Sequence, residues 1–150
     1  MKVALGIDVG TTGIKSMLVS ETGRVLACET REQHQFFPHP GWVEQDPREL
    51  IDLCLDSFQA LLTKSALCAR DVACLGLDHQ GESCLVWDKA SGAPLYPVIT
   101  WQDRRMAAVS EEYGKRHGAE IERLTGLRSD SYYSAWKIRW ILDHVKDGQA

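Results

Sequence analysis

Apolar and polar positions along the first third of the chain predict three short strands followed by a helix. Apolar residues dominate residues 3–7 and 14–19, and a third extended run covers residues 25–33. Glycine and threonine fill the link between the first two runs, and Gly23 lies in the next link. Short runs with links of this kind are typical of antiparallel hairpins. We therefore expect a three-stranded antiparallel meander at the start of the chain.

A helix is predicted to begin at Asp46. Asp46 is a favoured N-cap residue, Pro47 suits the first helical position, and Glu49 completes the start signal. The apolar residues that follow keep a helical spacing to about residue 63. They are Leu50, Cys54, Phe58, Leu61 and Leu62.

The middle of the chain predicts further extended segments. Residues 72–77 form an apolar run that ends at the polar residues 78–82. Residues 84–87 are expected to pair with a nearby strand, and residues 97–101 form a short extended segment.

The last third of the chain predicts helices at residues 103–116 and 134–145, with a short helix at residues 120–124 that stops at Gly126. A meander followed by helix, strand and more helices is the opening of a ribonuclease-H-like α/β domain. That fold needs further parallel strands, and residues 134–145 carry more apolar surface than a half-built sheet can cover. We therefore expect an N-terminal domain that is incomplete at its C-terminal end.

Composition mainly excludes some classes of partner. The 150 residues suit one domain, and 44% apolar with 25% charged residues is normal for a soluble globular protein. A net charge of −4 gives no reason to expect nucleic acid or an anionic membrane as partner. No apolar stretch reaches the roughly 18 residues of a transmembrane span, and the first residues lack the features of a signal peptide.

The cysteines indicate a reducing, cytoplasmic environment. Their number is odd and none forms a C-x-x-C pair, so they suit small, buried apolar positions. His34 and His39 have no cysteine at zinc-ligand spacing, so a metal site built on cysteine or histidine is not expected. The cysteines are Cys28, Cys54, Cys68, Cys74 and Cys84.

The link between the first two strands is the strongest candidate for chemistry. Residues 6–15 read GIDVGTTGIK, so the turn has open backbone amides and the hydroxyls of Thr11 and Thr12. Such a turn can wrap an anion. Asp8, at the end of the first strand, is placed to hold Mg²⁺ directly or through water, and Lys15 could add positive charge beside the same anion. An ordinary glycine-rich hairpin is the alternative interpretation.

This turn differs from the two commonest nucleotide loops. It lacks the Gly-Lys-Ser/Thr of the P-loop, and Gly6, Gly10 and Gly13 do not have the spacing of the dinucleotide fingerprint. The Asp-x-Gly-Thr-Thr sequence instead resembles the first phosphate loop of the actin, Hsp70 and sugar-kinase superfamily. That resemblance implies ATP as a ligand, with Gly13 among the donors to its phosphates.

A series of short motifs then resembles the N-terminal part of the FGGY carbohydrate kinases, and within that family most closely the glycerol kinases. The resemblance covers nearly all of the chain. Each motif is weak alone, but their shared order is specific. The motifs are residues 6–15, 40–47 (PGWVEQDP), 76–83 (GLDHQGES), 101–105 (WQDRR) and 125–144.

The resemblance implies an acceptor-binding site. In the glycerol kinases the loop after the fourth strand reads Asn-Gln-Arg-Glu, and its arginine and glutamate bind the polyol hydroxyls. Residues 79–82 read His-Gln-Gly-Glu here, so Glu82 keeps the glutamate and Gly81 replaces the arginine. Trp101 matches the tryptophan that lines the carbon face of the polyol, and Tyr132 the tyrosine that contacts it. The change at Gly81 opens room for a larger or differently oriented sugar or polyol.

Structural roles are the alternatives for these residues. Taken alone, Glu82 also suits a solvated turn, and Trp101 and Tyr132 also suit a hydrophobic core. We interpret Trp42 as a packing residue. The arginines at residues 104–105 are interpreted as ion-pair partners on the solvent face of a helix.

The resemblance implies a longer, two-domain enzyme that transfers the γ-phosphoryl group of ATP to a hydroxyl of a small polyol or sugar. In the family the general base is an aspartate of a later segment, which we expect to begin after Ala150, and the adenosine pocket lies mostly on the second domain. We therefore assign no catalytic residue to residues 1–150 and expect them to be inactive alone.

Two alternatives to this interpretation stay open. One is a non-catalytic remnant that binds a polyol or a protein partner. The other is a different ATPase of the superfamily. The sequence also leaves homo-oligomerisation open.

Overall fold

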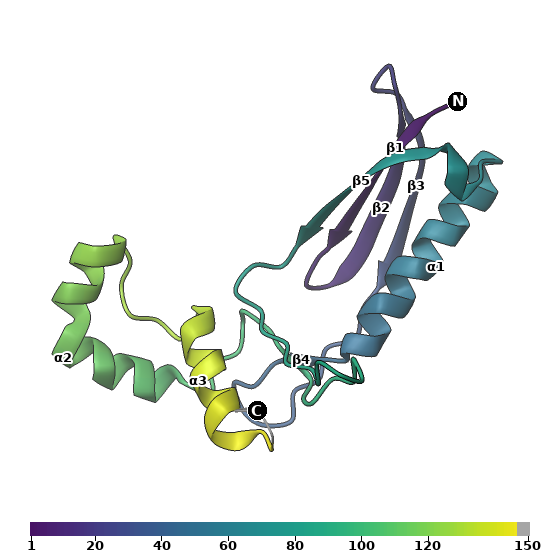
Figure 1. Cartoon of the computed structure of the whole chain (residues 1–150). Coiled ribbons are helices and arrows are strands. Elements are labelled where there is room, and N and C mark those ends of the chain that lie inside the picture. The colour runs from purple at the N-terminus through teal and green to yellow at the C-terminus, as the bar shows by residue number, and fades with distance from the viewer. Residues whose placement is uncertain (147–150) are drawn as a thin grey trace. The chain divides into compact units, whose positions relative to one another are not determined.

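The computed structural model describes residues 1–146, and it divides the chain into two compact units. The sheet unit consists of residues 1–34 and 46–80. The helix unit consists of residues 35–45 and the chain from residue 81 onwards. Figure 1 labels most of the elements of both units. Ala150, after which the general base is expected, lies outside the described residues, so the structure leaves that expectation untested.

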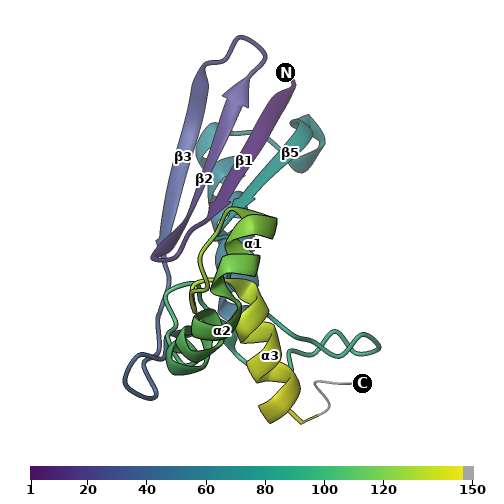
Figure 2. The same ribbon diagram turned by 90° about the vertical axis from the view of Figure 1, so that its left-hand side faces the viewer.

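The sheet unit is built on a four-stranded sheet with the strand order β3-β2-β1-β5 (Figure 2). Strands β1 (Val3–Val9), β2 (Gly13–Ser20) and β3 (Val25–Glu32) form the predicted antiparallel meander. Strand β5 (Val72–His79) pairs in parallel with β1 and forms one edge of the sheet. A parallel neighbour requires a crossover, which helix α1 (Pro47–Ser65) supplies.

Helix α1 begins where the sequence predicts it. The side chain of Asp46 accepts a hydrogen bond from the main-chain amide of Arg48 at 2.8 Å, and Pro47 occupies the first turn. Ala66 ends the helix in the left-handed conformation with φ of 54°. The helix packs on the sheet against β2 and β3. Its observed end at Ser65 lies slightly beyond the predicted one.

The core of the sheet unit lies between α1 and the sheet. Alternate residues of β1 and β2 point toward the helix, as period-two alternation requires. The edge strand differs, because its Leu75 and Leu77 remain 59% and 63% exposed. The buried apolar residues of this core are Val3, Leu5, Ile7, Ile14, Leu18, Ala27 and Leu61.

The helix unit combines a two-stranded ribbon with two helices. Strand β4 (Glu44–Gln45) pairs antiparallel with β6 (Val98–Ile99), and Cys84 and Ile99 form an additional bridge. Residues 84–87 were expected to pair nearby, and this bridge confirms the expectation in part. Helices α2 (Ala107–Thr125) and α3 (Ser134–His144) follow.

Helix α2 differs from the prediction. It is one continuous helix, whereas the sequence predicted a helix at residues 103–116 and a separate short one at residues 120–124. It also begins later, because Asp103 lies in a preceding turn, where its carboxylate accepts the main-chain amide of Val43 at 2.7 Å. A glycine costs a helix only about 1 kcal/mol relative to alanine, so Gly114 and Gly118 do not interrupt it. The end at Gly126, with φ of 73°, is as predicted.

The core of the helix unit is rich in aromatic residues. Trp140 and Ile141 of α3 are buried there, whereas Ile138 and Leu142 of the same helix are 49% and 37% exposed. None of the helices in residues 1–146 combines the length and the apolar character needed to cross a membrane. The buried apolar residues of this core are Cys84, Ile99, Met106, Trp140 and Ile141.

Candidate functional site

The predicted phosphate turn forms the tight hairpin between β1 and β2. The amide of Gly10 donates to the carbonyl of Gly13 at 3.1 Å and closes the turn. The amide of Gln33, just after β3, donates to the carbonyl of Thr12 at 3.2 Å and ties the turn to its neighbour. Thr12 is exposed and Thr11 is half-buried. The hairpin is therefore confirmed, whereas its binding of phosphate stays a prediction.

Two glycines of this turn lie where a side chain would be crowded, and Gly13 is the more restricted of the two. A Cβ atom at Gly13 would lie only 2.5 Å from the main-chain oxygen of Arg31 in β3. A Cβ atom at Gly10 would lie 3.0 Å from the main-chain oxygen of Gly13. The separation at Gly13 is an overlap, so a side chain there would force the hairpin away from β3, whereas the separation at Gly10 is a tight contact that a small shift would relieve. The glycines thus hold the turn in one tight conformation with its backbone close to the surface.

Charged residues lie in register beside the turn. Asp8 in β1 is the register partner of Lys15 in β2 and of Asp78 in β5. Register partners share a face of the sheet, and alternation places this face opposite the one that Ile7 presents to α1. Asp8 and Lys15 are exposed. The sheet thus brings together the predicted Asp8 and Lys15.

Asp78 is a residue that the sequence interpretation missed. The sequence signal for Asp78 is its position directly after the apolar run of residues 72–77, and in the structure it is the penultimate residue of β5. Its carboxylate accepts the amide of His79 at 2.9 Å. Within residues 1–146, no three or more carboxylate, histidine or cysteine side chains gather as a metal site. Asp8 nevertheless fits the oxygen chemistry of Mg²⁺, which is bound through one or two carboxylates together with substrate phosphates.

In the helix unit, Glu82 is held in an unusual conformation. Its φ of 63° lies in the left-handed region, which non-glycine residues rarely adopt. Its Oε2 atom accepts a hydrogen bond from the main-chain amide of Ser134 at 2.5 Å. Hydrogen bonds from the amide and side chain of Ser134, and the positive charge of Lys137, hold the pKa of Glu82 below its usual range. Glu82 is therefore an ionised, oriented hydrogen-bond acceptor at neutral pH.

The two predicted aromatic residues lie beside each other. The rings of Trp101 and Tyr132 meet edge to face with their centroids 5.9 Å apart. The amide of Trp101 donates to the hydroxyl of Ser83 at 3.1 Å, which links Trp101 to the residue after Glu82. Tyr132 is 42% exposed, and Glu82 and Trp101 are half-buried, so none of the three is fully enclosed in the core.

The fold thus gathers Glu82, Trp101 and Tyr132 from three separate segments of the helix unit. The fourth predicted residue, Gly81, is exposed, and a Cβ atom there would meet nothing within 4 Å. A Cβ atom at Gly81 therefore has open space around it. The phosphate turn belongs to the sheet unit.

Arg105 makes ion pairs as predicted, but it does not lie on the solvent face of a helix, and that part of the prediction is wrong. Its side chain is 0% exposed, and its Nη2 atom lies 2.7 Å from Glu44 and 2.9 Å from Asp103. Its guanidinium stacks 3.8 Å from the ring of Trp42 and 4.3 Å from that of Trp140. The planar, delocalised guanidinium suits such a site, because it stacks on rings while it pairs with carboxylates.

Trp42 and Arg104, which were interpreted together with Arg105, have different environments. Trp42 packs against Arg105 and meets Trp140 edge to face at 5.3 Å, which confirms its interpretation as a packing residue. Arg104 is exposed. This buried cluster of charge and aromatic rings holds β4 and the turn that precedes α2 together, because Glu44 belongs to β4 and Asp103 to that turn.

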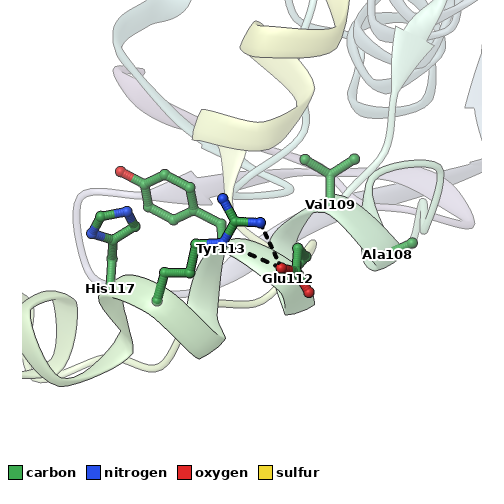
Figure 3. Close-up of a pocket in the computed structure, with 6 residues that line it drawn as sticks. Ala108, Val109, Glu112, Tyr113 and His117 are labelled. Carbon is green, nitrogen blue, oxygen red and sulfur yellow. Dashed lines mark hydrogen bonds and ion pairs between the residues drawn. The ribbon is translucent and has the colours of Figure 1, made fainter.

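Two surface clefts of the helix unit are lined by none of the predicted site residues. One cleft of about 430 Å³ lies along α2 (Figure 3). The rings of Tyr113 and His117 lie 4.4 Å apart there, and Arg116 pairs with Glu112 at 2.8 Å. A second cleft, of about 480 Å³, lies between α2 and the start of α3. Neither is lined by Glu82, Trp101 or Tyr132.

The meander, crossover helix and parallel strand, with the Asp-x-Gly-Thr-Thr turn at their edge, define the N-terminal part of an actin/Hsp70-like α/β fold, the ribonuclease-H-like class predicted from the sequence. More specifically, the chain belongs to the FGGY family of carbohydrate kinases, whose N-terminal domain matches residues 3–150.

Known relatives agree with this assignment. The glycerol kinases of Stenotrophomonas maltophilia (strain K279a) and Ralstonia pickettii (strain 12J) are each 40% identical to the chain, over 149 and 151 residues. These alignments cover 99% of this chain and 30% of each relative, so the chain spans about a third of their length.

Solved structures of the same fold are sugar kinases. The crystal structure of Plasmodium falciparum glycerol kinase with ADP has a TM-score of 0.90 and 26% identity, and the match covers 99% of this chain and 30% of that one. A ligand-bound xylulose kinase from Lactobacillus acidophilus has a TM-score of 0.86 at 23% identity, over 96% of this chain and 29% of its own. The latter likeness concerns the fold alone.

Proposed function

We propose that the chain provides the phosphate turn and the acceptor pocket of a kinase that phosphorylates a hydroxyl of a small polyol or sugar with ATP. The observation that carries this proposal is the convergence of Glu82, Trp101 and Tyr132 in the helix unit. A carboxylate beside two aromatic rings suits a ligand that has hydroxyls on one side and carbon on the other. The 40% identity to glycerol kinases supports the same substrate class.

On the phosphate side, the chain would act mainly through charge and hydrogen bonds. Bound ATP and Mg²⁺ would supply the phosphoryl group and neutralise its developing charge. The amides of Thr11, Thr12 and Gly13, with the two threonine hydroxyls, would donate to the phosphates. Lys15 would add positive charge, and Asp8 would orient the metal ion, directly or through water.

On the acceptor side, the chain would fix the hydroxyl group that attacks. Each carboxylate oxygen has more than one lone pair, so Glu82 can accept polyol hydroxyls while it keeps the amide of Ser134. Trp101 and Tyr132 would cover the carbon face of the acceptor. The open space at Gly81 favours an acceptor that is larger than glycerol or bound in another orientation.

The general base is the part that we do not assign to residues 1–150. The family resemblance implies an aspartate in a segment after Ala150, which would take the proton from the acceptor hydroxyl. Domain closure in the family would exclude water and limit wasteful hydrolysis of ATP. The proposal therefore concerns the protein at its native length, in its cytoplasmic setting.

The test is the dependence of ATP consumption on added acceptor. The protein purified at its native length is assayed for ADP release with a panel of polyols and sugars of three to six carbons. We expect ADP release that requires one class of acceptor. Hydrolysis of ATP that is indifferent to every acceptor would instead identify another ATPase of the same superfamily.

A non-catalytic binding role is the second candidate, and the exposed apolar surface of the sheet unit favours it. Leu75 and Leu77 of β5 and Ile51 and Leu55 of α1 are each about 60% exposed, and a cleft of about 410 Å³ lies between these elements. Exposed patches of this kind often bind partners. Sedimentation that shows concentration-dependent association, together with calorimetry that shows no acceptor binding, would favour this candidate.

A further inference from the structure

Lys137 of α3 is a buried charged residue to which the proposed reaction gives no role. It is only 1% exposed, and its Nζ atom donates to the main-chain carbonyls of Ser131 at 3.1 Å and Tyr132 at 2.6 Å. Among residues 1–146, no carboxylate lies within ion-pair distance of it. Burial is unfavourable for an ammonium group and lowers the pKa of Lys137. The ammonium group of Lys137 therefore fixes the main chain at Ser131 and Tyr132 through hydrogen bonds.

The same turn of α3 also holds Glu82. Ser134 is the first residue of the helix, and its amide donates to Oε2 of Glu82 at 2.5 Å. A carboxylate is stabilised at this end of a helix, where free amides and the helix dipole meet. The Sγ atom of Cys84 donates to the carbonyl of Ser134 at 3.7 Å, so the segment after Glu82 is tied to the same turn.

We propose that the first turn of α3 positions the acceptor pocket, with the Ser134 amide fixing the carboxylate of Glu82 and the Lys137 ammonium fixing the backbone that carries Tyr132. Ser134 and Lys137 are then positioning residues, because they touch the binding residues and not the acceptor. This inference rests on the proposed polyol or sugar kinase function. Its physical basis is that two polar groups of one helical turn, the Ser134 amide and the Lys137 ammonium, contact Glu82 and Tyr132. Those two residues lie far apart from each other in the sequence.

A proline at residue 134 tests the amide contact with little risk to the helix. Proline is favoured at the first helical position, and Tyr133 before it has φ of −75° and ψ of 144°, which suit a residue that precedes proline. Ser134→Pro therefore removes the donor to Glu82 and leaves the helix start in place. Ser134→Ala is the matched variant, because it keeps the amide and removes only the hydroxyl.

In the protein at its native length, we expect Ser134→Pro to raise the KM for the acceptor by about tenfold or more. The KM for ATP should stay within about twofold and the Tm within about 3 °C of the unsubstituted protein. Ser134→Ala should raise the acceptor KM by less than about threefold. Lys137→Met, which keeps the aliphatic stem without the charge, should reproduce the acceptor-specific rise, and Lys137→Arg should restore part of it.

Three results would overturn the inference or its premise. An acceptor KM that stays within about twofold in Ser134→Pro would exclude the positioning role. A parallel rise in both KM values with a lower Tm would show a merely structural role. An unsubstituted protein without acceptor-dependent ADP release would instead refute the proposed function. If Lys137→Met does not fold, the comparison of Ser134→Pro with Ser134→Ala decides the question.

Discussion

At the β1–β2 hairpin, the space around a single residue limits which side chain the fold can accept. Gly13 has no room for a Cβ atom against the main chain of Arg31, whereas Gly76 in β5 has open space. Both are strand glycines in the sequence, and both belong to the same sheet. The two glycines differ in their neighbours, because Gly13 faces the main chain of β3 and Gly76 faces open space.

Gly13→Ala is expected to lower the free energy of unfolding by about 1–3 kcal/mol, since the new methyl group overlaps backbone that cannot move aside cheaply. Gly76→Ala is the control, and we expect it to change stability by no more than about 0.5 kcal/mol. Urea denaturation of the two variants checks this prediction. Equal effects would mean that the hairpin can relax around a side chain at Gly13.

Asp8 and Glu82 allow the two halves of the proposed site to be separated by kinetics. In the protein at its native length, Asp8→Asn should lower kcat far more than it changes the acceptor KM, because it removes the charge that we propose orients the metal ion. Glu82→Gln should mainly raise the acceptor KM. Steady-state kinetics would contradict both roles if kcat/KM stayed within about threefold in each variant, which is under about 0.7 kcal/mol.

At the scale of elements, α2 shows that helix length depends on more than helix propensity. Its two internal glycines are tolerated, and each has a different environment. A Cβ atom at Gly118 would meet nothing within 4 Å, whereas one at Gly114 would lie 3.0 Å from the Cβ atom of Ser129. The hydroxyl of Ser129 also donates to the carbonyl of Ser110 at 2.8 Å, which holds it against the helix.

Gly118→Ala should therefore raise the free energy of unfolding by about 0.5–1 kcal/mol, because alanine restricts the unfolded chain and favours the helix. Gly114→Ala should gain nothing or lose stability, since its methyl group meets Ser129. Thermal denaturation followed by circular dichroism distinguishes the two. A larger gain for Gly114→Ala would show that the 127–131 segment is free to move away from α2.

For the whole molecule, the sheet unit carries the predicted phosphate contacts and the helix unit carries the predicted acceptor contacts. The chain passes from one unit to the other after His34, Gln45 and Gln80. Glu82 thus lies two residues after the last of these passages and three residues after the end of β5, so the edge strand leads almost directly to the first residue of the proposed acceptor site.

Residues 1–150 alone are expected to give no multiple-turnover release of ADP with any acceptor, because the general base is assigned to a segment after Ala150. The measurement is a coupled ADP assay on the isolated chain, compared with the protein at its native length. The intact mass of the native protein is measured first, because it shows whether the isolated chain and the protein at its native length are different samples. Repeated turnover by the 150-residue chain would place the base within it.

Local signals allowed much of the fold to be predicted. The apolar runs with Gly/Thr links gave the meander, and the Asp46-Pro47 start gave α1, because a turn and a helix cap depend on a few neighbouring residues. The ordered motifs also named Glu82, Trp101 and Tyr132, which the structure brings together. Their roles in binding stay predictions.

The sequence by itself determined the order of the elements, the glycine turn and the types of residue available for chemistry. Only the tertiary structure decided which of those residues meet. It buried Arg105 between two tryptophans, placed Asp78 in register with Asp8, and turned Ser134 and Lys137 toward Glu82 and Tyr132. Except for the contact of Lys137 with Tyr132, five residues away, these contacts join residues far apart in the chain. They therefore depend on how the elements pack, and no local sequence pattern predicts them.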